Sequence, residues 1–120
     1  MDFSQCNPIS TEYDLNGPLL HILRRLEVAM AMSFDDFTEL KINSAYRSKE
    51  YEKRMGRDGS SSHCLGKAVD ISCTSNSKRH FIIKFALQNG INRIGVYKTF
   101  IHLDTAIYKD GKQPNIIWYG

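Results

Sequence analysis

The 120-residue chain lacks any long apolar run and any block of one charge. No stretch approaches the roughly 20 apolar residues that a membrane-spanning helix needs. The net charge is only +3, and no lysine- or arginine-rich block is interleaved with aromatic residues, as it would be in a typical nucleic-acid-binding surface. The composition therefore predicts neither membrane insertion nor a nucleic-acid partner.

Cysteine is also scarce, with Cys6, Cys64 and Cys73 as the three examples. An odd number of cysteines argues against a disulfide framework, and the absence of a C-x-x-C pair excludes a cysteine-rich zinc module. The first residues show no basic segment followed by an apolar core, so we expect no secretory signal peptide. Reduced thiols in a chain that is made in the cytoplasm are the expectation.

The remaining composition is that of an ordinary globular protein, with 42% hydrophobic and 24% charged residues. A chain of this length can build one modest core. The first 17 residues are polar and rich in turn-forming residues. We therefore expect a single domain over residues 1–120, with residues 1–17 as an N-terminal arm.

Apolar residues recur at helical spacing from Pro18 to Met32, which predicts an amphipathic helix. Ser75 and Gly90 are suitable start and stop residues for a second long helix, and residues 49–55 favour a short one. Strands are predicted at Leu40–Ala45, Ala68–Cys73, Arg93–Tyr97, Phe100–Asp104 and Ile116–Tyr119. This order of elements predicts an α+β fold, with an antiparallel sheet and flanking helices. Trp118, on the last strand, is expected to fill the core.

One predicted strand carries a charge among apolar neighbours, because Asp70 lies within Ala68–Ile71. A buried lone carboxylate is costly unless a positive group lies beside it. His63 precedes this strand, and His102 lies on a later strand, two residues before Asp104 and hence on the same face. Two imidazoles and one carboxylate are a common ligand set for catalytic zinc, which activates a water molecule for amide hydrolysis. These residues predict a zinc site that offsets the charge of Asp70.

The segment Ser61–Ile71 (SSHCLGKAVDI) resembles the S-x-H-x-x-G-x-A-x-D signature of the zinc D-alanyl-D-alanine carboxypeptidase family. That family includes L-alanyl-D-glutamate endopeptidases of phage lysins and shares its fold with the hedgehog signalling domain. Ser44–Ser48 resembles the family's upstream segment, and Gly95–Tyr97 with Phe100–Asp104 resembles its downstream one. The resemblance implies a small hedgehog-like domain.

The resemblance also implies roles for individual residues. The implied zinc ligands are His63, Asp70 and His102. Arg47 would bind a substrate carboxylate or the oxyanion of the intermediate, for which a fixed guanidinium is suited. Ser61 would donate a hydrogen bond to the substrate at the rim of the site. Asp104 would either orient a ligand imidazole or act on the metal-bound water.

One position departs from the family pattern. Many members carry an acidic residue three positions before the last zinc histidine as the general base, and this chain has Thr99 there. The region from Val96 to Ile101 contains no acid, which leaves the base unassigned, with Asp104 as the first candidate.

Three functions remain open on these grounds. The leading one is a zinc peptidase, expected to be a monomer, that cleaves peptide stems of bacterial peptidoglycan after another factor releases it from the host cytoplasm. The second is a non-catalytic zinc-bound binding module of the same fold. The third is an amidase or dipeptidase for small intracellular substrates. The bond that is cut, whether D-Ala-D-Ala, L-Ala-D-Glu or a cross-link, is open as well.

Overall fold

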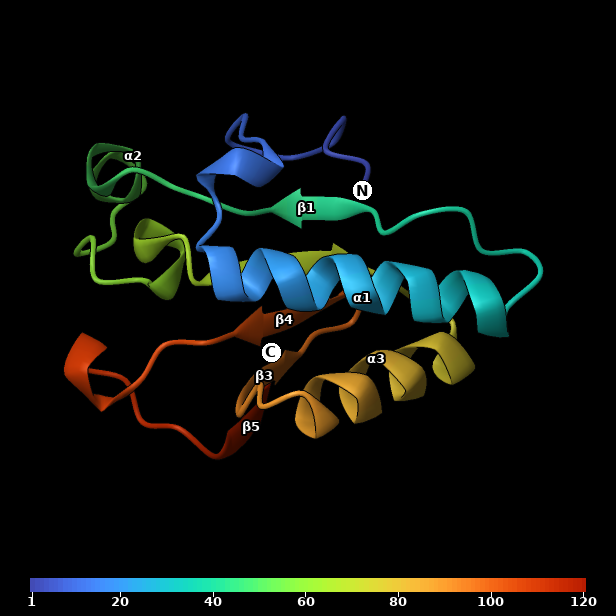
Figure 1. The fold of residues 1–120 in the computed structure, drawn as a ribbon. Coiled ribbons are helices and arrows are strands. Elements are labelled where there is room, and N and C mark those ends of the chain that lie inside the picture. Colours follow the sequence, from blue (N-terminus) through green and yellow to red (C-terminus); the bar gives the residue numbers. More distant parts are fainter.

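The structure is a computed structural model that describes residues 1–120, and a five-stranded sheet lies at its centre (Figure 1). The strands follow the order β1-β2-β4-β3-β5. Their bounds are Ile42–Ser44 for β1, Ala68–Ser72 for β2, Arg93–Val96 for β3, Phe100–Asp104 for β4 and Ile116–Tyr119 for β5. The helices are α1 (Gly17–Ser33), α2 (Lys49–Arg54) and α3 (Asn76–Gln88), and short 3-10 turns occupy Glu12–Asp14, Ser62–Leu65 and Tyr108–Asp110. The predicted α+β class is confirmed.

The last strand differs from the expected antiparallel arrangement, because β5 pairs with β3 in parallel. Asp104 at the end of β4 lies opposite Arg93 at the start of β3, so the chain leaves β4 next to the first residue of β3. The connection to β5 stays at this end of the strands and places Ile116, the first residue of β5, beside Arg93. A strand that begins there must run in the same direction as β3, which makes the sheet mixed.

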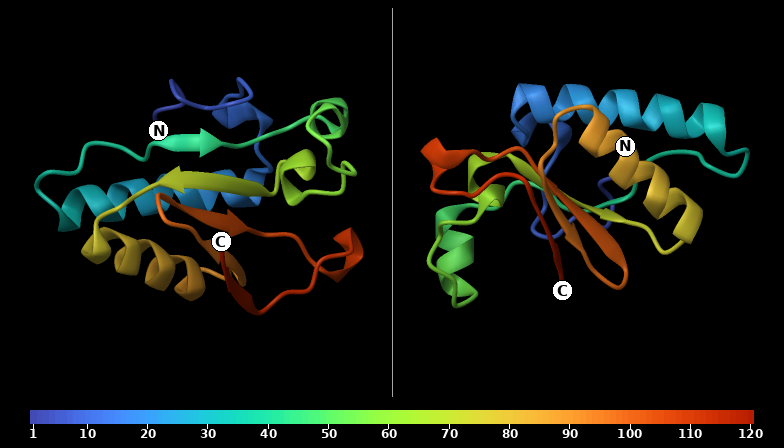
Figure 2. Two further views of the ribbon diagram at one scale, coloured as in Figure 1. Left: turned by 180° about the vertical axis from the view of Figure 1, so that it is seen from behind. Right: turned by 90° about the horizontal axis from the view of Figure 1, so that it is seen from below.

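Helices α1 and α3 cover one face of the sheet, as the two views in Figure 2 show. Pro18 lies in the first turn of α1, where its missing N–H is not needed. Ser75 caps α3, because its side chain accepts a hydrogen bond from the Lys78 backbone N–H. Both helices start and end within two residues of the predicted positions.

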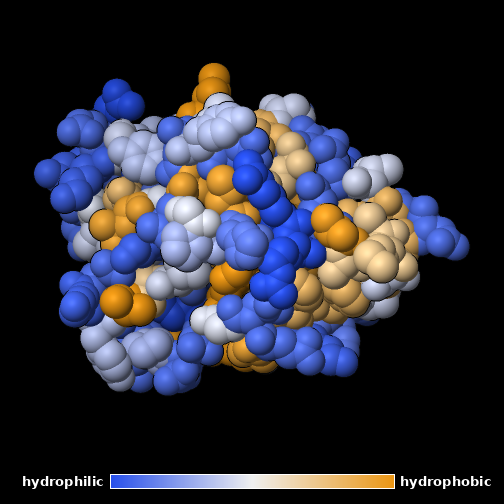
Figure 3. Space-filling view, in the orientation of Figure 1, coloured by the Kyte–Doolittle hydropathy of each residue, from blue (hydrophilic) through white to orange (hydrophobic).

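The core lies between these helices and the sheet. Strands β2 and β4 alternate, so Val69 and Ile71 face the helices together with Ile101 and Leu103. The helices contribute Leu19, Leu23, Leu26, Met30, Ile82 and Ala86. Figure 3 shows the outer side of this helical layer, on which apolar patches are interrupted by hydrophilic side chains. None of the helices combines the length with the apolar character that crossing a membrane requires.

The first residues pack along the outer edge of β1. Asp2 forms a bridge with Lys41, and its backbone exchanges hydrogen bonds with Leu40 and Ile42 at 2.8 and 2.9 Å. The N-terminal ammonium lies 2.9 Å from the Glu27 carboxylate on α1. This segment therefore covers part of an edge strand that would otherwise present unpaired backbone groups.

Candidate metal centre

Five residues form one row across the open face of the sheet, one from each strand. Asp70 lies opposite His102, and His102 lies opposite Gly95. The row continues to Ser44 on β1 and to Trp118 on β5. We call these five residues the site row. Strand pairing alone therefore brings together two of the three predicted metal ligands, which are 32 residues apart in the chain.

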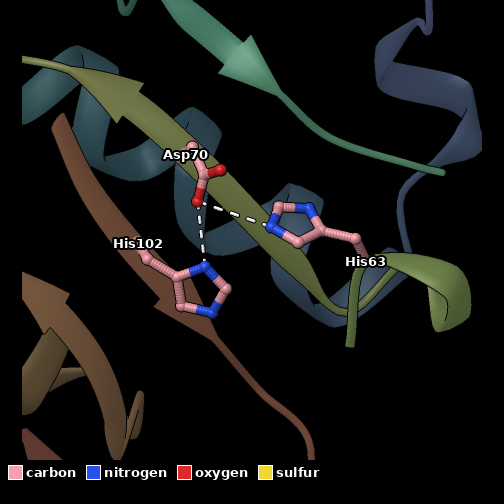
Figure 4. Close-up of side chains that lie close together, drawn as sticks. All are labelled: His63, Asp70 and His102. Atoms are coloured by element: carbon pink, nitrogen blue, oxygen red, sulfur yellow. Dashed lines mark hydrogen bonds and ion pairs between the residues drawn. The ribbon is translucent and has the colours of Figure 1, made fainter. Parts of the chain in front are cut away.

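His63 reaches the row from the 3-10 turn that precedes β2 (Figure 4). The Ser61 hydroxyl caps this turn by accepting a hydrogen bond from the His63 backbone N–H. Gly66 ends the turn at a φ of +67°, and a Cβ there would lie 2.7 Å from the Asp14 carbonyl oxygen. A glycine is thus required for the chain to turn from His63 into β2 at this close approach.

The ring of His63 has a fixed tautomer. Its Nδ1 lies 2.6 Å from the Ala45 carbonyl oxygen, which can only accept a hydrogen bond, so Nδ1 carries the proton. Nε2 then has a free lone pair, and it lies 3.4 Å from Asp70 Oδ1. Figure 4 shows this nitrogen directed at the same carboxylate oxygen that His102 approaches.

His102 lies between two carboxylates. Its Nδ1 is 2.9 Å from Asp70 Oδ1, and its Nε2 is 3.0 Å from Asp104 Oδ2. Burial alone would lower the pKa of His102, but hydrogen bonds to Asp104 and Asp70 outweigh it and raise the pKa above 6.5. When Nε2–H is donated to Asp104, Nδ1 is left to bind a metal on the Asp70 side.

These donor atoms fit a zinc ion. Nε2 of His63, Oδ1 of Asp70 and Nδ1 of His102 lie within 4.8 Å of one another, and the three side chains are at most 12% exposed. A tetrahedral zinc with ligands at about 2.1 Å needs donors about 3.4 Å apart, close to the observed 2.9 and 3.4 Å. Since His63 Nε2 and Asp70 Oδ1 are both acceptors that face each other, a cation between them removes their repulsion. The predicted ligand set therefore agrees with the chemistry of its donors.

Asp70 is held from its other side by Arg47. The Arg47 Nη2 lies 3.4 Å from Asp70 Oδ2, and its Nε donates to the Ser44 hydroxyl at 2.9 Å. Without an ion, burial favours the neutral form of Asp70, but the imidazoles of His102 and His63, which donate hydrogen bonds to Asp70 when they are protonated, outweigh burial and lower its pKa. Oδ1 therefore remains a charged ligand atom, and Arg47 fixes the direction in which it points.

Asp104 lies behind His102 rather than in the open site. Its side chain is 1% exposed, Arg93 Nε lies 3.3 Å from Oδ2, and the Ala106 N–H donates to Oδ1 at 2.8 Å. Burial alone would raise the pKa of Asp104, but a hydrogen bond from His102 and others lower it to about 2. Of the two roles considered for Asp104, this geometry favours orienting His102 over acting on a water molecule.

A cleft of about 280 Å³ opens over the site row. It is lined by Arg47, Arg57, Ser61, His63, Asp70, Tyr97, Phe100 and His102. The predicted substrate-binding residues Arg47 and Ser61 thus share one cleft with all three predicted ligands. Asp70 is the only carboxylate among the lining residues, and Thr99 is exposed outside the cleft.

Sequence reasoning missed part of this site. Trp118 does not fill the core as expected, but is half-buried, with its ring 5.2 Å from that of His102. Its indole N–H donates to the Tyr97 hydroxyl at 2.9 Å. The reason is Gly95, which leaves open the space between β4 and β5 that the indole occupies. The sequence alone gives no signal for this, because the pairing of Gly95 with His102 and Trp118 is known only from the structure.

Glu52 and Arg57 were missed as well. Glu52 is fully buried although it is charged, and Arg57 Nη1 binds its carboxylate at 2.8 Å. Nothing in the local pattern of α2 distinguishes Glu52 from the exposed Glu50. The three cysteines are free, as expected, and burial raises the pKa of each thiol.

Comparison with known proteins gives one family match. The family model described as peptidase M15 matches residues 4–104, a range that includes Arg47, Ser61 and all three candidate ligands. No curated protein gives a significant match to the chain.

Proposed function

The chain belongs to the peptidase M15 family, the zinc D-Ala-D-Ala carboxypeptidases, and from this we propose that it is a zinc-dependent peptidase that hydrolyses amide bonds in the peptide stems of bacterial peptidoglycan. One observation carries the proposal. His63 Nε2, Asp70 Oδ1 and His102 Nδ1 converge at a cleft that is open to a peptide.

Each protein group has a distinct task in this proposal. His63, Asp70 and His102 hold the ion. Zinc, when bound, polarises the amide carbonyl and activates water. Asp104 keeps the proton of His102 on Nε2, so that Nδ1 stays available to the ion. Arg47 keeps Asp70 in place and adds positive charge beside the reacting carbonyl.

Tyr97 is a further polar group in the cleft. Its hydroxyl oxygen accepts the hydrogen bond of Trp118, and the hydroxyl proton has no acceptor within the protein. The stack of Tyr97 on Phe100, with ring centroids 4.4 Å apart, fixes the phenol in position. The phenol therefore supplies a hydrogen-bond donor for a peptide that lies in the cleft.

Peptidoglycan stems suit this cleft because they carry free carboxylates, and two arginines line it. The test is mass spectrometry of purified peptidoglycan after incubation with the protein, with and without a chelator. We expect new peptide fragments only without chelator, and their masses identify the bond.

His102→Ala should abolish both zinc binding and fragment release. His21→Ala is the matched control, since His21 is exposed on α1 away from the cleft, and should change neither. Normal zinc content and full activity in His102→Ala would refute the proposal.

A second candidate is a non-catalytic module that binds cell-wall peptides. It is favoured by one observation, that no carboxylate other than Asp70 lines the cleft to serve as a base. Zinc binding and peptide binding without turnover of any stem peptide would support this candidate over the peptidase.

A further inference from the structure

We propose that Arg57, held in place by buried Glu52, is a specificity-determining residue that binds a carboxylate of the substrate at the rim of the cleft. The proposal rests on the proposed peptidase function and adds to it a site for one substrate group. It also assigns the two arginines different roles: Arg57 binds the substrate, and Arg47 chiefly positions the metal ligand Asp70.

The backbone places Arg57 at the cleft. Helix α2 ends in a turn in which the Gly56 N–H binds the Lys53 carbonyl and the Arg57 N–H binds the Glu52 carbonyl, at 3.1 and 2.9 Å. This is the hydrogen-bond pattern of a Schellman motif. It requires the left-handed conformation at Gly56, whose φ is +83°. Arg57 therefore leaves the helix in one defined direction.

The side chain of Arg57 is fixed as well. Glu52 has no exposed surface, and its Oε2 lies 2.8 Å from Arg57 Nη1 and 3.8 Å from Arg47 Nη1. A buried carboxylate requires positive partners, so Glu52 keeps both guanidinium groups next to each other. Arg47 and Arg57 are therefore a pair of cations that both contact the same buried carboxylate, that of Glu52.

The two arginines differ in what they can still bind. Arg47 is 17% exposed and is already engaged with Ser44, Asp70 and Glu52. Arg57 is 50% exposed, and of its five N–H groups only one has a protein acceptor. Arg57 therefore presents free donors to the cleft, whereas those of Arg47 are largely occupied.

A carboxylate is the ligand that matches these donors. The guanidinium fork binds planar two-oxygen anions with two parallel hydrogen bonds, and an amide in the same place lacks both the charge and the second acceptor oxygen. The only acid that lines the cleft is Asp70, which is already paired with Arg47. The rim at Arg57 thus offers free N–H donors to a negative group, because the Glu52 carboxylate occupies one N–H from beneath and does not itself line the cleft.

The test compares two forms of one stem peptide that the enzyme cleaves, one with a free carboxylate and one with the same group amidated. For the unchanged protein we expect a KM about 10- to 100-fold lower for the free acid. Arg57→Gln should remove this preference by raising KM for the acid alone, with kcat nearly unchanged. Arg54→Gln is the matched control, because Arg54 lies on the same helix, is exposed and does not line the cleft.

A second measurement is independent of catalysis. Calorimetric titration of the zinc-loaded protein with N-acetyl-D-alanine and with its amide should show tighter binding of the acid, lost in Arg57→Gln and kept in Arg54→Gln. Absence of hydrolysis with this binding pattern intact would overturn the peptidase proposal only. Equal KM and equal binding for acid and amide, or a preference that survives Arg57→Gln, would overturn the role of Arg57.

Discussion

Alternate residues of strands β2 and β4 form the two faces of the sheet, and the two faces differ in the kind of contact that they make. One face buries Val69, Ile71, Ile101 and Leu103 under two helices, where any apolar side chain of suitable volume would serve. The other face carries the site row, in which each polar atom has a particular partner at a particular distance. Stability therefore depends on the sum of many contacts on the first face and function on a few contacts on the second.

This comparison predicts that changes on the two faces have separable effects. A change under the helices should reduce the free energy of unfolding and leave zinc affinity nearly unchanged in the folded fraction. A change on the other face, to a metal ligand or to the residue that orients it, should alter zinc affinity by more than it alters stability. Four experiments test the separation, beginning with the largest expected effect.

Leu23→Ala should give the largest loss of stability. Leu23 is fully buried on α1, and truncation of such a residue costs about 2–5 kcal/mol because a cavity remains. Urea unfolding of the zinc-free protein measures the loss, and zinc titration of the folded variant should give an unchanged affinity. Val28→Ala, at a mostly exposed position of the same helix, is the control and should have a small effect on stability. A large fall in zinc affinity in Leu23→Ala would show that the faces are not independent.

Gly95→Ala should displace side chains of the site row, because it adds a methyl group at the centre of the row. The new Cβ would lie 2.7 Å from Trp118 Nε1 and 2.8 Å from Tyr97 Cε2, so the indole must move away from His102. Overpacking of this kind costs about 1–3 kcal/mol. The fluorescence of Trp118, the single tryptophan, should change together with the unfolding midpoint. An unchanged spectrum would contradict the packing described for β5, and Gly17→Ala, at a glycine with no heavy atom within 4 Å of its Cβ position and no positive φ, serves as a comparison.

Asp104→Asn should weaken zinc binding about 10- to 100-fold, the usual effect of losing a carboxylate that orients a ligand histidine. The amide cannot hold His102 Nε2–H as firmly, so Nδ1 is less often free for the ion. Competition with a zinc-sensitive dye measures the affinity. Asp110→Asn is the control, since Asp110 pairs with Lys67 outside the cleft, and it should leave the affinity unchanged. Unaltered affinity in Asp104→Asn would remove the orienting role.

The smallest expected effect is the acid sensitivity of the zinc-free protein. His102 and other hydrogen-bond donors lower the pKa of Asp104 from 3.8 to about 2 against the effect of burial. A lowered pKa stabilises the fold above pH 3.8, and the stabilisation is lost as the pH falls towards 2, by about 1 kcal/mol between pH 4 and 3. Unfolding free energies across this range should show a smaller loss in Asp104→Asn. The same pH dependence in Leu23→Ala as in the unchanged protein would confirm that the effect belongs to the site face.

The alternation of β4 explains why much of this arrangement could be predicted from sequence. Ile101 and Leu103 identify the buried face, so His102 and Asp104 must lie on the other one. The apolar surroundings of Asp70 identify its strand in the same way. Helices α1 and α3 follow from their caps and apolar spacing, because these signals are local.

Contacts between distant segments were not predictable on those grounds. The burial of Glu52 depends on Arg57 and Arg47, which reach it from a turn and from the segment after β1. The parallel pairing of β5 depends on the path of residues 105–115, which have no strand or long-helix pattern of their own. The expected core position of Trp118 is wrong because the space that its indole occupies above Gly95 depends on which strands are neighbours.

Because the site row depends on strand register, zinc binding also reports whether the strands are paired in the native alignment. If β4 slipped by one residue against β2, His102 and Asp104 would turn under the helices and Ile101 and Leu103 would turn outwards. A chain misaligned in this way would keep its strands and helices but would have no place for the ion. The fraction of purified protein that takes up one equivalent of zinc should therefore count the molecules whose strands have paired in the native alignment, which circular dichroism would not distinguish.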